Sequence, residues 1–171
     1  ARMLSDQDLG DLLWAAQGVN REDGRLTSPT AMNRQEIRLY VFTAKEVSLY
    51  DPKTHSLTQV AKGDHRGIVA ANQPFSKEAP VSLLMVADMD KFGSKGEHAQ
   101  AMVAVDTGIV TENINLFCSA AGLATVTRGT MDSKAITILR HAVNSFQRIS
   151  NFTGLVLITT KTWRCVILLP W

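Results

Sequence analysis

Apolar and polar positions recur with two different periods along the chain, and the changes of period predict the elements. Over residues 5–17 the apolar positions follow a helical spacing that begins after Ser5, a residue suited to cap a helix N-terminus, and stops at Gly18. Over residues 37–42 apolar positions alternate with a period of two, which is typical of a strand. We therefore expect a helix followed, after a polar loop, by a strand.

The next segments continue the sheet. Residues 46–60 predict a β-hairpin whose turn is the run Asp-Pro-Lys-Thr at 51–54. Residues 63–79 predict a helix followed by a loop. Residues 80–88 are apolar at odd and even positions alike, which indicates a central strand buried on both faces.

Residues 94–121 form the longest predicted helix, and Gly122 supplies its C-terminal stop. Small and apolar residues lie almost all round this helix, so we expect it to be buried, either at the centre of the domain or against a second subunit. Polar residues, among them Asp106 and Glu112, interrupt it too often for a membrane span.

The remainder predicts a strand over 123–129, a helix over 132–146, and strands over 154–160 and 164–170. Helices and strands are mixed without an internal repeat. The sequence thus predicts one α+β domain over residues 1–171.

Composition narrows the class of partner. The formal net charge of the 171 residues is only +2 and no dense Lys/Arg stripe is present, which argues against a nucleic-acid partner. Neither of the two cysteines lies in a metal-binding pattern, so we expect buried thiols in a reducing compartment and no metal site. No signal-peptide pattern is visible, and we expect a cytoplasmic protein with residues missing upstream of Ala1.

Common catalytic motifs are missing from the sequence, including the phosphate-binding loop and the dinucleotide fingerprint. What remains is the polar stretch at 28–36, where Ser28 before Pro29 predicts the N-cap and first turn of a short helix running to Glu36. The free N–H groups of a helix start, together with the amides of Asn33 and Gln35, would suit the pyrimidine edge of a flavin. A capped helix without a ligand is the alternative interpretation.

The order of segments resembles the FMN-dependent nitroreductase family. The run LLWAAQGVNR, the segment SPTAMNRQ at 28–35 and the run CSAAGLATVTRG at 118–129 are similar to family motifs that occur in the same order. Together with the intervening segments, the resemblance extends from residue 3 to about residue 132.

The resemblance implies a nitroreductase-like α+β fold, with a mostly antiparallel sheet flanked by helices and a long central helix at a homodimer interface. It also implies that FMN lies at this interface and is contacted by both chains. Such enzymes use NAD(P)H to reduce the flavin and pass the electrons to nitroaromatics, quinones or similar acceptors in a ping-pong cycle. The flavin performs the chemistry, so no catalytic side chain is expected.

The resemblance also implies two sets of cofactor-binding residues. One set lies on the pyrimidine side of the flavin: Pro29, Thr30, Ala31, Asn33 and Gln35. The other approaches the opposite face and the N5 edge: Leu123, Ala124, Thr125 and Val126. Arg128 is either a contact to flavin or substrate, or a solvated arginine at a strand end.

The chain departs from the family pattern at both ends. The family carries an Arg-x-Ser-x-Arg segment that binds the FMN phosphate, whereas only Arg2 precedes the first helix here. Residues 133–171 lack the family's usual Gly-Tyr-Pro-like ending, and the stretch 149–171 is unusually apolar for a C-terminus. Two alternatives to an enzyme therefore stay open: a flavin-binding or sequestering protein without turnover, and a degenerate member that keeps the fold without flavin.

Overall fold

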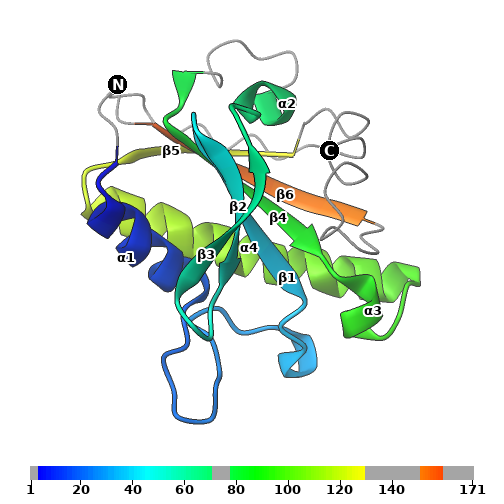
Figure 1. The fold of residues 1–171 in the computed structure, drawn as a ribbon. Helices are drawn as coiled ribbons and strands as arrows, with labels where there is room; N and C mark the ends of the chain where they lie inside the picture. Colours follow the sequence, from blue (N-terminus) through cyan, green and yellow to red (C-terminus); the bar gives the residue numbers. More distant parts are fainter. Residues whose placement is uncertain (1–3, 71–77, 130–150, 160–171) are drawn as a thin grey trace.

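The computed structural model describes residues 4–70, 78–129 and 151–159, and within them six strands form one sheet (Figure 1). The sheet order is β3-β2-β1-β4-β6-β5 and every neighbouring pair is antiparallel. The strands are β1 (Ile37–Phe42), β2 (Glu46–Asp51), β3 (Ser56–Lys62), β4 (Val81–Ala87), β5 (Ala124–Arg128) and β6 (Asn151–Thr159).

The two strands β1 and β4 carry apolar side chains on both faces, and this divides the core into two layers. Leu39 of β1 and Leu83 of β4 belong to the cluster that packs against α1 (Asp6–Gln17) and α4 (Glu97–Ala120). Their neighbours Tyr40 and Leu84 point the other way, into a smaller cluster that includes Val69. Because successive strand residues face opposite sides, a strand buried on both faces must lie inside the sheet.

The helix α4 is the longest element, and its C-terminal end has a defined stop. Gly122 adopts a left-handed backbone with φ of 67° and donates its N–H to the carbonyl of Ser119, while the Leu123 N–H donates to Cys118. These two hydrogen bonds form a Schellman motif, which satisfies the last carbonyls of the helix and directs the chain into β5.

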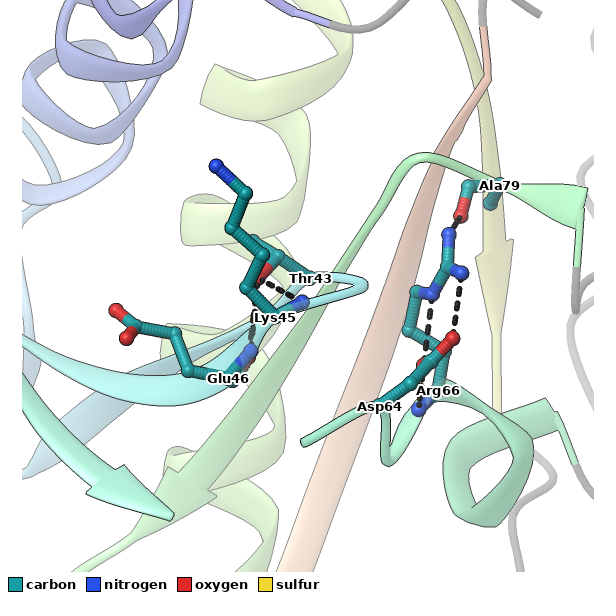
Figure 2. Close-up of polar contacts among 6 residues, drawn as sticks. All are labelled: Thr43, Lys45, Glu46, Asp64, Arg66 and Ala79. Carbon is teal, nitrogen blue, oxygen red and sulfur yellow. Dashed lines mark hydrogen bonds and ion pairs between the residues drawn. The ribbon is translucent and has the colours of Figure 1, made fainter. Parts of the chain in front are cut away.

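The short helix α2 (Arg66–Ala70) is held by two arginines. Arg66 donates to both carboxylate oxygens of Asp64, at 2.9 and 2.6 Å, and to the carbonyl of Ala79 at 2.8 Å (Figure 2). From the other side, the buried guanidinium of Arg128 donates to the carbonyls of Val69 and Ala70, at 3.2 and 3.0 Å. Arg66 thus joins the helix to the start of β4, and Arg128 joins it to β5.

The α+β class and the antiparallel sheet are confirmed, as are the first helix, the hairpin and the central strand. The long helix begins at Glu97, after its N-cap Gly96, and not at residue 94 as predicted. Met89–Phe92 form a separate short helix, α3, that ends at the left-handed Gly93. The helix predicted over 132–146 and the strand predicted over 164–170 lie outside the described residues. Among the residues that are described, no helix is long and apolar enough to cross a membrane.

Replacement of Gly122 by alanine tests the helix stop. A Cβ at this left-handed position should lower the free energy of unfolding by about 1 kcal/mol, because L-residues are strained there. Gly67→Ala is the control, since Gly67 lies on the exposed side of α2 with open space around a new Cβ and no positive φ. Urea denaturation checks both variants, and equal stabilities would contradict the assigned role of Gly122.

Candidate functional site

The segment 28–36 does not form the predicted helix. Only the three residues Ala31–Asn33 make a single turn, η1, and Thr30 before it is extended. Met32, Asn33 and Gln35 all have left-handed backbones, with φ near 50°. Ser28 is not a cap, because its hydroxyl is buried without a hydrogen-bond partner in the described part of the chain. The helix prediction was wrong because long-range contacts override the local capping pattern.

Several hydrogen bonds hold this turn, which we define as residues 30–35. The carboxylate of Asp106 on α4 accepts the N–H of Ala31 at 2.8 Å. The Thr30 hydroxyl accepts the N–H of Gln35 at 2.8 Å, and the ammonium group of Lys91 donates to the Gln35 carbonyl at 2.5 Å. Three non-glycine residues in a left-handed conformation cost free energy, and such strain often occurs at functional sites. The turn keeps its shape because these partners fix it from both sides.

A buried acidic pair lies next to the turn. Glu36 is fully buried, and Asp106 is 4% exposed. Burial raises the pKa of Glu36 to about 7, and the neighbouring carboxylate of Asp106 adds to the rise while the charge of Lys91 opposes it. Neither side-chain oxygen of Glu36 has a hydrogen-bond partner of normal length and angle among the described residues. The burial of Glu36 beside Asp106 therefore favours its protonated form.

A pocket of about 360 Å³ opens beside the turn. Its wall combines predicted site residues with residues that sequence reasoning missed: Arg21, Arg25, Leu26, Pro29, Thr30 and Asn33. The guanidinium groups of Arg21 and Arg25 make only long contacts with neighbouring residues of the same loop. Arg21 donates to the carbonyl of Leu26 at 3.3 Å, and Arg25 lies 3.3 Å from an exposed carboxylate of Asp23. Two cations, an amide and a hydroxyl around one hollow suit a polar ligand that carries negative charge.

The two arginines were missed because they lie in a loop whose composition predicts only solvation. Their position in the sequence was the available signal: they flank Glu22 and Asp23 and lie shortly before the motif at 28–35. A polar loop next to a candidate site is a better source of ligand contacts than its composition suggests. Spacing along the sequence alone does not show that the loop folds back, which it does through the bridge between Val19 and Leu26.

The second predicted set lies on β5 and at its start. Leu123 is buried and the four residues after it are half-buried. The Thr125 hydroxyl donates to the side-chain oxygen of Asn115 at 3.1 Å, and the amide of Asn115 donates to the Thr127 hydroxyl at 3.4 Å. Arg128 is 5% exposed, so its interpretation as a solvated strand-end arginine was wrong.

The two predicted sets are not brought together within one chain. Asp106 contacts the turn and Asn115 contacts β5, and both belong to α4. Nine residues of helix correspond to a rise of roughly 13 Å and to half a turn of rotation, so the two side chains leave α4 on opposite sides. Ala31 contacts α4, and the carbonyl of Gln35 contacts α3. Gln35 also contacts the pocket wall, because its backbone N–H donates to the Thr30 hydroxyl and its side-chain amide donates to the Asn33 side-chain oxygen. Pro29, Thr30 and Asn33 line the pocket.

The sequence was compared with protein families and with known proteins. Residues 1–160 match the nitroreductase family. A nitroreductase-family protein from Methanocaldococcus jannaschii is 28% identical over 139 residues, which cover 74% of this chain and 69% of the relative.

Solved structures agree with this match. A nitroreductase-family protein from Ralstonia eutropha superposes with a TM-score of 0.82 and 28% identity, over 95% of this chain and 76% of the other. A protein of the same family from Desulfovibrio desulfuricans, solved in complex with FMN, has a TM-score of 0.62 and 19% identity, over 95% and 77% of the two chains. At that identity the second likeness concerns the fold alone.

The buried Glu36 predicts a pH-dependent stability. Its pKa is raised from an ordinary value of 4.5 to about 7 in the folded chain, so the native state binds more protons than the unfolded state between these values. The stabilisation is therefore complete below about pH 4.5 and is lost as the pH rises through 7. Relative to wild type, Glu36→Gln should be similar at pH 4.5 and more stable at pH 8, by about 3 kcal/mol at most. Denaturant unfolding across this range checks it, and a difference that does not vary with pH would contradict it.

Proposed function

This chain belongs to the nitroreductase family, and on that premise we propose that it is an FMN-dependent oxidoreductase. We propose that it uses NAD(P)H as electron donor and reduces nitroaromatic, quinone or similar acceptors in a ping-pong cycle. When bound, FMN would accept two electrons as hydride from the donor and release them to the acceptor. A cytoplasmic location belongs to the same proposal.

The pocket beside the turn is the observation that supports this proposal most directly. Its donor set fits a flavin, because Asn33 and Thr30 offer an amide and a hydroxyl to a heterocyclic edge and Pro29 with Leu26 offers apolar surface to a ring. The remaining wall is formed by the two guanidinium groups. We propose that Pro29, Thr30 and Asn33 hold the pyrimidine side of FMN, with Ala31 and Gln35 fixing the backbone of the turn.

Arg21 and Arg25 would supply positive charge to the bound FMN. Guanidinium groups match phosphate oxygens with paired, charge-assisted hydrogen bonds. They would also stabilise negative charge that develops on the pyrimidine edge during reduction, since a preoriented cation favours the charged state. The side chains of the chain thus bind and polarise the cofactor, and none of them has to transfer a proton in this proposal.

A homodimer would complete the site. One stripe of α4 is exposed although it is formed largely of small and apolar residues: Ala101, Ala104, Val105, Gly108, Glu112 and Leu116. Val105 is 57% exposed and Leu116 is 61% exposed, more than an isolated soluble helix face normally leaves open. Packing of this stripe against a second copy would let the turn of one chain approach β5 of the other. The separation of the two predicted sets along α4 supports a site shared between two chains.

Turnover separates an enzyme from a flavin-binding protein. We expect the flavin-loaded protein to oxidise NADH or NADPH only when a quinone or nitroaromatic acceptor is present, and at a rate that saturates in both substrates. Parallel lines in double-reciprocal plots would support the ping-pong order. Stable flavin binding without any acceptor-dependent oxidation would instead support the sequestering alternative.

Asn33→Ala tests the pyrimidine contact. Loss of the amide should weaken FMN binding by roughly 1–3 kcal/mol, the usual cost of leaving a buried polar partner unmet. Titration of apoprotein with FMN, followed by quenching of flavin fluorescence, measures the affinity. Unchanged affinity would remove Asn33 from the site.

Arg25→Gln tests the proposed charge on the pocket wall. We expect FMN affinity to fall and its dependence on salt to become weaker, because one charge-assisted contact is lost. Arg34→Gln is the control for net charge, since Arg34 is exposed on the neighbouring turn but does not line the pocket. An equal loss in both variants would mean that net charge, and not a contact in the pocket, attracts the cofactor.

Leu116→Glu tests the shared site. A buried charge at the C-terminal end of the α4 stripe should convert the dimer to a monomer and weaken FMN binding with it. Leu57→Glu is the control. Leu57 is also exposed, at 41%, but it lies on β3, the edge strand at the opposite end of the sheet from β5. Sedimentation equilibrium gives the mass. A dimer that survives Leu116→Glu would exclude this face as the interface.

A further inference from the structure

We propose that the carboxyl groups of Glu36 and Asp106 form a proton-dependent latch, which holds the turn of residues 30–35 while the pair carries one negative charge and loosens it when the pair carries two. The proposal concerns the turn itself. Its consequence for flavin binding rests on the function proposed above.

The first step is the unusual environment of Glu36. Its side chain is fully buried, and among the described residues neither carboxyl oxygen has a hydrogen-bond partner of normal length and angle. Burial of an ionised carboxylate without donors is among the most costly arrangements in a protein interior, whereas a neutral carboxyl is tolerated far better. Glu36 is therefore the member of the pair that keeps the proton.

Asp106 is the member of the pair that contacts the turn. It accepts the N–H of Ala31 at 2.8 Å, and a hydrogen bond from an N–H is stronger to a carboxylate than to a neutral acid. This bond is the link between α4 and the turn. A second negative charge beside Asp106 would repel it and draw it toward other donors or water, which weakens that link.

The charged groups that act on Glu36 come from two elements. Asp106 on α4 disfavours its ionisation, and Lys91 on α3 favours it. The ammonium group of Lys91 is already committed to the Gln35 carbonyl and lies near the exposed ion pair of Arg38 with Asp88. Burial and Asp106 together outweigh the opposing effects of the Glu36 backbone N–H and of Lys91, so the pKa of Glu36 is raised to about 7.

The turn is ready to respond because it stores backbone strain. Met32, Asn33 and Gln35 keep left-handed conformations only while their partners hold them. A weaker bond to Ala31 should let these residues relax. If the turn binds FMN as proposed, affinity should then fall as the pH rises through 7.

The amide proton of Ala31 reports the latch directly and requires no cofactor. In the ¹⁵N-labelled full chain, its chemical shift should titrate with a midpoint near pH 7 and become independent of pH in Glu36→Gln. Glu46→Gln, the same chemical change on β2, should keep the wild-type titration. An Ala31 amide that does not titrate, or one that titrates equally in Glu36→Gln, would overturn the proposal.

Two further measurements separate the possible failures. Asp106→Asn keeps an oxygen that can accept the Ala31 N–H but removes the charge. The midpoint of the Ala31 titration should therefore move to lower pH, and this holds even if Glu36→Gln folds poorly. An unmoved midpoint would overturn the latch.

Wild-type FMN affinity should be several-fold weaker at pH 8 than at pH 6, and the Glu36→Gln affinity should not change. If Ala31 titrates as expected but FMN binds at neither pH, the latch stands and the proposed function fails. If FMN binds equally at both, the effect of the latch on binding is wrong.

Discussion

The hydrogen bond between the Asp106 carboxylate and the Ala31 N–H is the interaction on which the candidate site depends. It joins the longest helix of the molecule to a turn that has no regular secondary structure beyond three residues. A buried acceptor on a rigid helix fixes the position of a strained backbone more precisely than the turn could fix itself. Because Asp106 also lies beside Glu36, the same group that shapes the turn makes it sensitive to protonation.

The helix α4 has a second role that follows from its two faces. Its buried face packs on the sheet and on α1, and includes Val103, Val110 and Ile114. Its exposed stripe of small and apolar residues offers a surface where a second backbone can approach closely. One element therefore supports the core, the turn and, in the proposed dimer, the contact with the partner chain. This explains why the sequence of α4 is apolar almost all round while containing one buried aspartate.

Sequence reasoning predicted the fold well because the signals were periodic. The burial of β4 on both faces and the stop at Gly122 follow from hydrophobic pattern and backbone chemistry that act locally. The turn at 30–35 was predicted incorrectly because its conformation depends on Asp106 and Lys91, which are more than fifty residues away in sequence. Local capping rules cannot detect such partners.

The residues that line the pocket were likewise predicted only in part. Pro29, Thr30 and Asn33 were expected from a motif and do line it, whereas Arg21 and Arg25 were not expected, because charge in a loop carries no directional signal. Arg128 was wrong only as a solvated strand-end arginine, because its buried side chain donates to the carbonyls of Val69 and Ala70 in α2, and its contact with flavin or substrate remains a prediction. The contacts of the β5 residues with a flavin remain a prediction.

The visible absorption spectrum of the purified protein, with the released chromophore identified, tests the central claim most directly. The proposed site predicts a yellow protein, or a colourless one that turns yellow with added FMN, holding about one FMN per chain. A colourless protein that takes up no FMN at any pH between 6 and 8 would contradict it, and the chain would then be a nitroreductase fold without its cofactor.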